Sequence, residues 1–451
     1  MDKTLELISG YAASLSYEDL PDSAIRAAKH RIIDSLGCAL GAYHAEPCKI
    51  ARRLCYPTGC LLTARVIGSL KKTTPEMAAF ANSIMVRYLD FNDSYRAKDG
   101  GHPSDAIPAV LAVAEAVQAD GKSLITAIVL AYEMAVRIIE ESPLDERGWD
   151  QPVYIVLGSA LGAGKLLGLS REQLANAAAL ALVPNIAMYQ SRIGELSMWK
   201  AGAAGMAARQ GIFAALMARE GMTGPEEAFE GKYGLFNQVT GPMNLEPLGG
   251  KRTQFGVERP NLKYYPVRDS IQFVIDTVLD LRKQVSPGDI KSLYAKTYAS
   301  AIRTAVESKQ LWAPQTRETA DHSQPFCIAA AILDGDITAE TFSRERYLDQ
   351  DLLDMIGKLK IEEDPEYSKQ TPAKRNFYIE ATTHSGETYS AHRILTADDL
   401  KKGWSDEQVK AKFRGLARDI LTPSQTQASL DIFWHLEELD DTAKILDNLE
   451  A

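Results

Sequence analysis

Apolar residues recur at helical spacing from the N-terminus to about residue 240. The first stripe consists of Leu5, Ile8, Ala12 and Leu15, positions that share one face of a helix. The same period predicts further helices over residues 75–88, 105–118, 122–141, 155–167, 171–184 and 199–219. Many of these segments are rich in Ala and Gly, which allows close packing, so we interpret the stripes as the core of a helical domain.

The pattern changes in residues 245–268, where Gly, Pro and charged residues interrupt the helical period and predict a boundary. Beyond it, Ile290–Tyr298 could be a strand, and residues 323–334 are typical of a buried helix. Two strand-like segments, Phe377–Thr383 and Glu387–Ile394, flank the turn residues 384–386 and predict a hairpin.

Helical periodicity returns in the last fifty residues. The chain is therefore predicted to be mainly α, with a large all-helical domain made of residues 1–265 and 396–451. A smaller α+β domain, residues 266–395, is predicted to be inserted before the C-terminal helices.

The charge of the chain limits its partners. Fifty Lys and Arg against 60 Asp and Glu give a formal net charge of −10 among 451 residues, which argues against a dedicated nucleic-acid binder and against general binding to anionic membranes. A small anionic ligand stays possible, because a binding site is local and net charge is not.

No membrane segment or secretion signal is expected. The N-terminal stretch carries Asp2 and Glu6, and the most apolar stretch, Ser123–Ile139, contains Glu133 and Arg137. The odd count of five cysteines makes a disulfide framework improbable and favours a reducing cytoplasm. Neither the cysteines nor the scattered histidines have metal-ligand spacing, so we predict no metal.

Two short motifs resemble catalytic signatures without completing them. Gly158–Lys165 has five residues between its first Gly and the Gly-Lys pair, whereas a phosphate loop needs four, so close helix packing is the better interpretation. Ser197-Met-Trp-Lys200 fits S-x-x-K, which leaves serine acyl transfer as an alternative, although the partner motifs of that class are missing.

The most unusual segment is Leu89–Asp105, LDFNDSYRAKDGGHPSD, between two apolar helices. It holds Asp90, Asp93 and Ser94 close to a Gly-His-Pro turn at His102. A carboxylate and an imidazole held near each other on a rigid turn suit acid–base chemistry, so we predict a functional loop.

Two further polar clusters could contact an anion. Arg192, Ser197 and Lys200 lie between strongly apolar helices, and the two cations suit carboxylates, although Ser197 could simply cap the next helix. The third cluster runs from Lys263 to Gln272 at the predicted domain boundary, where ligand sites are common.

These segments together resemble the MmgE/PrpD family, which includes 2-methylcitrate dehydratases, cis-aconitate decarboxylases and an epimerase of iminodisuccinate. The resemblance rests on five motifs in the same order, followed by WSDEQVKAKFRGLA near the C-terminus: LDFNDSY…GHPSD, RIGELSMWKAGAA, GMTGPEEAFEG, LKYYP and ADHSQPFCIAAAILDGDI. It implies a helical domain with an inserted α+β domain, a homodimer, and no metal or organic cofactor.

The resemblance also implies roles for individual residues. The catalytic residues would be His102, Asp90 and Lys200. The substrate-binding residues would be Ser94, Asp93, Arg192, Ser197, Lys263, Tyr264, Gln272 and Gln151. Three positions depart from the dehydratase-like pattern: Gln151 and Ser270 stand where a histidine is usual, and Phe326 stands where a tyrosine is common.

The expected activity is that of a cofactor-independent lyase on a small polycarboxylate, most simply dehydration of a 2-methylcitrate-like hydroxy acid in propionate metabolism. His102 would act as acid and base with Asp90 as its orienting partner, and Lys200 would be the second participant. Decarboxylation of the cis-aconitate type and epimerisation of the iminodisuccinate type share the same carbanion-like step and stay open. A non-catalytic homologue is a further alternative, favoured by the three departures.

Overall fold

The computed structural model describes residues 1–250 and 253–451, so Lys251 and Arg252 of the predicted boundary segment lie outside the described residues. The chain is mainly α, as the periodicity predicts. It divides into two compact units. The larger unit consists of residues 1–191, 199–262 and 404–451, and the smaller unit of residues 192–198 and 263–403.

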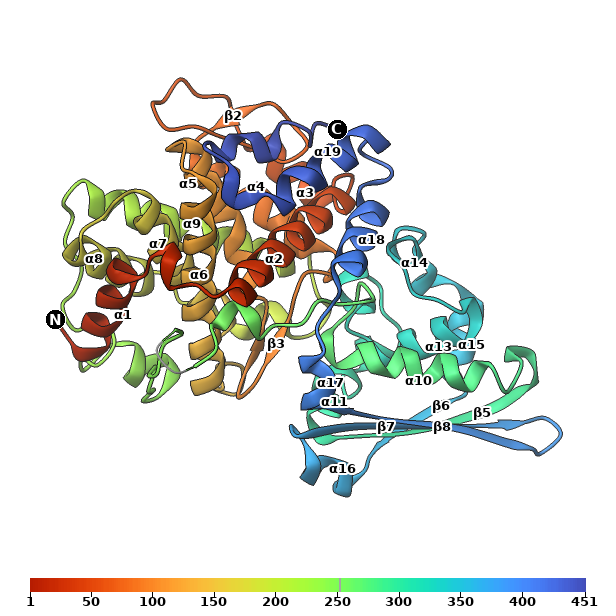
Figure 1. The fold of residues 1–451 in the computed structure, drawn as a ribbon. Coiled ribbons are helices and arrows are strands. Elements are labelled where there is room, and N and C mark those ends of the chain that lie inside the picture. The colour runs from red at the N-terminus through yellow and green to blue at the C-terminus, as the bar shows by residue number, and fades with distance from the viewer. Residues whose placement is uncertain (251–252) are drawn as a thin grey trace. The chain divides into compact units, whose positions relative to one another are not determined.

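The larger unit is a bundle of helices with two short antiparallel strand pairs (Figure 1). Its helices are α1 (Lys3–Ser14), α2 (Asp22–Gly41), α3 (Glu46–Arg53), α4 (Pro75–Tyr88), α5 (Ile107–Ala116), α6 (Gly121–Glu141), α7 (Pro152–Leu166), α8 (Arg171–Leu182), α9 (Trp199–Arg219), α18 (Asp406–Ala417) and α19 (Pro423–Trp434). The strand pairs are β1 (Ala64–Arg65) with β2 (Lys72–Thr73), and β3 (Tyr95–Arg96) with β4 (Gly100–Gly101). The helices predicted over 75–88 and 199–219 are confirmed at both ends.

Small residues let these helices approach closely. A Cβ added at Gly205 of α9 would lie 2.6 Å from the carbonyl oxygen of Phe80 in α4, and one at Gly158 of α7 would lie 2.7 Å from that of Ala131 in α6. Either would force the backbones apart. The Gly158–Lys165 stretch lies entirely inside α7, where its glycines allow close packing. The contact at Gly205 holds the start of α9 against α4.

The C-terminal helix α18 packs against α2 and adds a buried ion pair. The Lys412 ammonium lies 2.6 Å from the Asp34 carboxylate and donates to the carbonyl oxygen of Phe91 at 2.7 Å. Both charged side chains are almost fully buried, at 5% and 1% exposure. Since Phe91 follows Asp90, α18 helps to hold the loop that carries the predicted acid–base residues.

The smaller unit contains a four-stranded mixed sheet of order β6-β5-β7-β8. Its strands are β5 (Ile290–Thr297), β6 (Leu359–Glu363), β7 (Lys374–Thr383) and β8 (Thr388–Thr396). Its helices are α10 (Gln272–Arg282), α11 (Ala299–Ala305), α12 (Arg317–Ala320), α13 (Gln324–Asp334), α14 (Ala339–Ser343), α15 (Gln350–Gly357), α16 (Pro365–Gln370) and α17 (Ala397–Lys401).

The predicted hairpin is confirmed: β7 and β8 pair antiparallel from Lys374↔Thr396 to Thr382↔Thr388. Gly386 in the turn has a φ of 90°, a conformation that glycine adopts readily. The predicted strand from Ile290 and the predicted buried helix at 323–334 are confirmed as β5 and α13. Helix α10 lies along one face of this sheet (Figure 1), and with α13 and α15 it covers the core of the unit.

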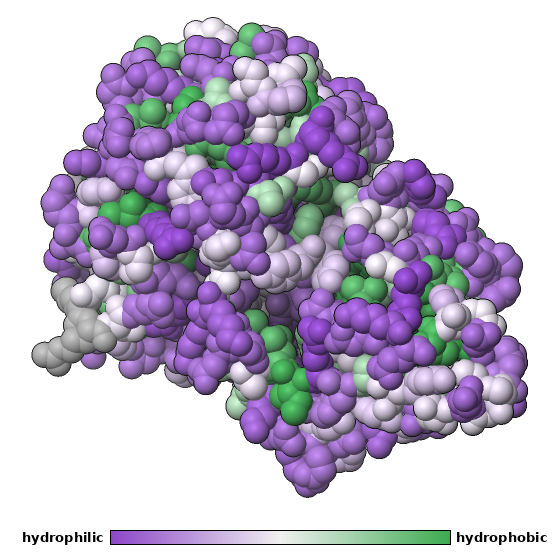
Figure 2. Space-filling view, turned by 45° about the vertical axis from the view of Figure 1, so that its right-hand side comes forward, coloured by the Kyte–Doolittle hydropathy of each residue, from purple (hydrophilic) through white to green (hydrophobic). Residues whose placement is uncertain are grey.

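Among the described residues, no helix combines the length and the hydropathy that crossing a bilayer would require. Figure 2 shows a mostly hydrophilic face on which hydrophobic residues form small, separate patches. Scattered patches of this kind are usual on protein surfaces.

The hairpin β3–β4 leads into His102, and its turn holds an unusual acid. The backbone N–H of Asp99 donates to the Ile139 carbonyl oxygen at 3.0 Å, which keeps the turn against α6. The Asp99 side chain is buried, and burial raises the pKa of its carboxyl to about 7. This carboxyl group is therefore partly protonated near neutral pH.

We expect Lys412→Met to lower the free energy of unfolding by about 3–5 kcal/mol, because it leaves the Asp34 carboxylate buried without its cation. Urea denaturation followed by circular dichroism measures this. The double variant Lys412→Met/Asp34→Leu removes both charges and should recover most of the loss. A single variant as stable as the wild type would show that this ion pair does not stabilise the bundle.

We expect Asp99→Asn to reduce the pH dependence of stability. The unfolded carboxyl ionises near pH 4 and the folded one near pH 7, so wild-type stability falls as pH rises between them, by at most about 1.4 kcal/mol per pH unit. The Asn variant lacks this slope, which urea denaturation at pH 4.5, 6 and 8 would detect. The exposed acid Asp431 provides the control variant Asp431→Asn. Equal slopes in wild type and Asp99→Asn would contradict the expectation.

Candidate active site

The loop between α4 and α5 brings one carboxylate between two cations. Asp90 has a φ of 50°, a left-handed conformation that Asp tolerates better than most residues. Its Oδ2 lies 3.1 Å from Nζ of Lys200 in the first turn of α9, and its Oδ1 lies 3.1 Å from Nη1 of Arg87 in α4. Asp90 and Lys200 are each 1% exposed. Two adjacent cations offset the cost of burying this carboxylate.

His102 lies beside that carboxylate and is held at two points. Its Nε2 is 3.8 Å from Asp90 Oδ1. Its Nδ1 lies 2.6 Å from the backbone carbonyl oxygen of Asp93, and its backbone N–H donates to Oε1 of Gln151 at 3.0 Å. The sequence predicts Asp90 as the orienting partner. In the structure the close contact to Nδ1 comes from the Asp93 carbonyl, and Asp90 faces the other ring nitrogen.

Gln151 joins the His102 turn to a second buried carboxylate. Its Nε2 donates to Oδ2 of Asp105 at 3.0 Å, while Oδ1 of Asp105 accepts from Nδ2 of Asn92 at 2.9 Å. Because an N–H can only donate and a carboxylate oxygen can only accept, these partners determine which way the Gln151 amide points. An amide therefore stands here in place of the imidazole that is usual in the dehydratase-like pattern.

Asp93 and Ser94 follow Asp90 in the same loop. The Asp93 carboxylate is fully buried and accepts from the Tyr132 hydroxyl at 2.8 Å and from the Ser104 backbone N–H at 3.1 Å. Ser94 is buried as well, and its backbone N–H and carbonyl pair with Asn261 at 2.8 and 2.7 Å. Both residues are thus buried in the loop that carries Asp90, and their contacts tie this loop to its neighbours.

The predicted residues Arg192 and Ser197 belong to the smaller unit, in the segment 192–198. This segment is fixed there by Thr316 and Thr319, whose hydroxyl groups bond the backbone carbonyl and N–H of Leu196 at 3.0 and 2.9 Å. Ser197 is exposed, and α9 begins two residues later.

Lys263, Tyr264 and Gln272 also belong to the smaller unit. Lys263 is 1% exposed, whereas the Tyr264 side chain is exposed. The Gln272 amide bonds the backbone of the turn before it: Oε1 accepts from the N–H groups of Tyr264 and Tyr265, and Nε2 donates to the carbonyl oxygens of Tyr265 and Val267. Gln272 therefore holds the shape of the turn that carries Lys263.

Sequence reasoning missed a second imidazole–carboxylate pair, in the smaller unit. Nδ1 of His322 lies 2.6 Å from Oδ1 of Asp321, whose Oδ2 accepts from Arg317 at 2.8 Å. Asp321 and His322 lie in the motif ADHSQPF and Arg317 lies just before it. The motif was therefore visible in the sequence, but no role was assigned to this imidazole or its carboxylate. Two of the departures also lie in this unit: Phe326 packs in the core against Phe342, and Ser270 is buried.

Arg87 was missed as well. It is a buried cation within the otherwise apolar end of α4, three residues before Asp90. A charged residue among apolar helical positions usually has a partner nearby, so the spacing could have indicated the pair.

Within either unit taken by itself, no three described Asp, Glu, His or Cys side chains each bring a ligand atom to within 4.8 Å of the others. The expectation that the chemistry uses no metal or cofactor stays a prediction.

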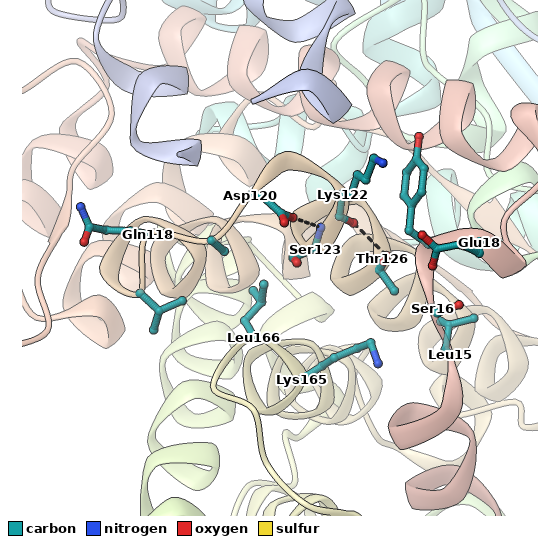
Figure 3. Close-up of a pocket in the computed structure, with 13 residues that line it drawn as sticks. Leu15, Ser16, Glu18, Gln118, Asp120, Lys122, Ser123, Thr126, Lys165 and Leu166 are labelled. Carbon is teal, nitrogen blue, oxygen red and sulfur yellow. Dashed lines mark hydrogen bonds between the residues drawn. The ribbon is translucent and has the colours of Figure 1, made fainter. Parts of the chain in front are cut away.

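A pocket of about 680 Å³ in the larger unit contains none of the predicted site residues (Figure 3). Its polar groups serve the ends of helices. Asp120 accepts from the Ser123 N–H, the Thr126 hydroxyl donates to the Lys122 carbonyl, and the Lys165 ammonium donates to the Ala12 carbonyl at 2.9 Å. The first two contacts stabilise the start of α6, and the third links α7 to α1.

The cluster of Asp90, His102, Lys200 and Arg87 has the parts that proton transfer at carbon requires. A neutral imidazole can take a proton, an ammonium group can stabilise the negative charge that develops, and a buried carboxylate can stabilise the imidazolium. Little water reaches these groups, so their electrostatic interactions are stronger than they would be on the surface.

The chain matches known proteins over nearly its whole length. Residues 6–248 match the MmgE/PrpD N-terminal domain and residues 265–438 the MmgE/PrpD C-terminal domain. It is 27% identical to a 2-methylcitrate dehydratase of Salmonella typhi, covering 93% of this chain and 91% of the relative. It is 27% identical to a 2-methylcitrate dehydratase of Cupriavidus necator, covering 92% and 90%, and 26% identical to the human cis-aconitate decarboxylase, covering 94% and 89%. The chain therefore belongs to the MmgE/PrpD family.

Proposed function

We propose that this protein is a lyase that acts on a small polycarboxylate, and that its reaction is the dehydration of a 2-methylcitrate-like hydroxy acid. The observation that carries the proposal is the buried Asp90 carboxylate between Lys200 and Arg87, with the His102 imidazole beside it. The names of the two dehydratase relatives support the choice of substrate class.

In the proposed reaction, Nε2 of His102 takes the proton from the carbon next to a substrate carboxylate. The electron pair of the broken C–H bond passes into that carboxylate, and the Lys200 ammonium stabilises the resulting charge. The C–O bond then breaks, and the electron pair leaves with the hydroxyl group. The imidazolium returns the proton to this group, which departs as water, while Asp90 at 3.8 Å stabilises the charged ring in between.

We further propose that Arg192 and Lys263 bind substrate carboxylates, as a guanidinium and an ammonium group suit this role. The homodimer implied by the family and the cytoplasmic location favoured by the cysteine content stay predictions.

Decarboxylation of a cis-aconitate-like acid is the second candidate, and Gln151 favours it. An amide at this position cannot donate a proton to a leaving hydroxyl group, so in dehydration His102 alone must act as both base and acid. Loss of carbon dioxide has no hydroxyl group to protonate, and the carbanion that it leaves would take its proton from the His102 imidazolium. The human decarboxylase relative has a similar identity and coverage.

We expect incubation with methylcitrate, citrate, cis-aconitate and iminodisuccinate, followed by mass spectrometry, to show loss of water from methylcitrate. Loss of carbon dioxide from cis-aconitate would instead establish the second candidate, and deuterium uptake from heavy water without a further mass change would indicate epimerisation. The His102→Ala protein is the control for background reaction. If no acid reacts, the non-catalytic alternative replaces the proposal.

We expect His102→Ala and Lys200→Met each to lower kcat/KM about a hundredfold or more, because each removes a positioned acid–base group or charge stabiliser. Steady-state kinetics on the acid that reacts would measure this, and circular dichroism would check folding. The exposed His435 in the same unit provides the matched control His435→Ala, which should keep wild-type kinetics. Near-normal kinetics in a folded His102 or Lys200 variant would remove that residue from the site.

A further inference from the structure

Asp93 is a poor candidate for direct contact with substrate, although the sequence suggests it. Its side chain is only 1% exposed, and its carboxylate already accepts from the Tyr132 hydroxyl and the Ser104 backbone N–H. Nε of Arg31 also lies 3.8 Å from Oδ2. A carboxylate would moreover repel a polycarboxylate substrate. The Asp93 side chain is therefore expected to hold neighbouring parts of the protein in position instead of binding substrate.

The backbone carbonyl of Asp93 decides the proton arrangement of His102. It lies 2.6 Å from Nδ1, and a carbonyl oxygen can only accept a hydrogen bond, so Nδ1 carries the proton. In the neutral ring the lone pair is then on Nε2, the nitrogen that faces Asp90. This tautomer is the one in which Nε2 can act as a base.

The position of this carbonyl depends on the Asp93 side chain. Asp93 lies outside any helix or strand, so no regular backbone ladder fixes it. Its carboxylate is anchored by Tyr132 on α6, with Arg31 of α2 close by, and by Ser104 just beyond His102. Burial and the nearby Asp93 hold the pKa of Tyr132 well above its usual range, so the hydroxyl remains a donor throughout the working pH range.

We propose that Asp93 is a positioning residue for His102: its carboxylate, held by the Tyr132 hydroxyl, places the backbone carbonyl that keeps the imidazole in the Nδ1–H tautomer. The importance of this tautomer for turnover rests on the proposed function, but the tautomer itself can be measured without substrate. The tautomer of His102 and its importance for turnover are therefore tested separately.

The first test is ¹⁵N NMR of protein labelled at histidine, at pH 8.5, where an unperturbed imidazole is neutral. The signals of His102 are identified by their loss in His102→Gln. We expect the wild type to show the Nδ1–H tautomer alone and Tyr132→Phe to show a mixture of both tautomers. The control is Tyr11→Phe, since the Tyr11 hydroxyl donates to the Gly249 carbonyl elsewhere in the larger unit. An unchanged tautomer in folded Tyr132→Phe would overturn the proposal.

The second test is kinetic. On the acid that reacts, we expect Tyr132→Phe to lower kcat about tenfold with KM changed less than about twofold, because a misplaced base slows the chemical step without removing a substrate contact. Tyr11→Phe should leave both parameters unchanged. A rise in KM alone would mean that Asp93 and Tyr132 contact substrate and would overturn the positioning role.

Asp93→Asn is the second variant, and it decides the matter if Tyr132→Phe does not fold. The amide keeps the size of the side chain but removes the charge that binds Tyr132 and Arg31. We expect the same change of tautomer. A wild-type tautomer in Asp93→Asn would overturn the proposal. If none of the acids is turned over while both variants change the tautomer, the proposed function fails and the positioning role stands.

Discussion

Burying the Asp90 carboxylate inside a helical bundle is the constraint on which much of the larger unit depends. A charge taken out of water is costly unless cations replace the solvent. Arg87 supplies one from the end of α4 and Lys200 the other from the start of α9. These two helices can place their charges on a single carboxylate because they pack closely, and Gly205 against the Phe80 carbonyl makes that approach possible. The small residues of α9 therefore serve the site as well as the core.

The whole loop that carries Asp90 depends on contacts with surrounding elements. It passes from α4 to α5 with little regular structure, so its backbone is held by side chains from surrounding elements. Lys412 of α18 binds the Phe91 carbonyl, and Gln151 binds the N–H of His102. A site built in this way is preorganised, because the groups that would meet the developing charge are already in position before substrate arrives.

The structure shows which contacts Gln151 and Phe326 make, two of the residues that depart from the dehydratase-like pattern. Gln151 keeps the hydrogen bonds that support the His102 turn but cannot transfer a proton. Phe326 fills the core of the smaller unit, where a phenol would need a partner. The support for the His102 turn is thus retained, while neither Gln151 nor Phe326 can supply a proton. Both proposed reactions are compatible with such a site, since loss of a proton and loss of carbon dioxide next to a carboxylate leave charge in the same place.

The sequence by itself determined the mainly α fold, most helix positions of the larger unit, the β7–β8 hairpin and the loop in which Asp90 and His102 lie. These follow from apolar periodicity and turn chemistry, which act between residues close together in the chain. Only the tertiary structure decided which groups pair. Arg87 and Lys200 both pair with Asp90. The Gln272 amide binds the backbone of the turn before it. The backbone carbonyl of Asp93, and not the carboxylate of Asp90, holds Nδ1 of His102. Lys200 comes from an element far away in the sequence. The other partners lie only three to nine residues apart, but many residues share such spacings, and backbone carbonyls leave no trace in residue identity. Their choice depends on distance and burial, which exist only once the chain has folded.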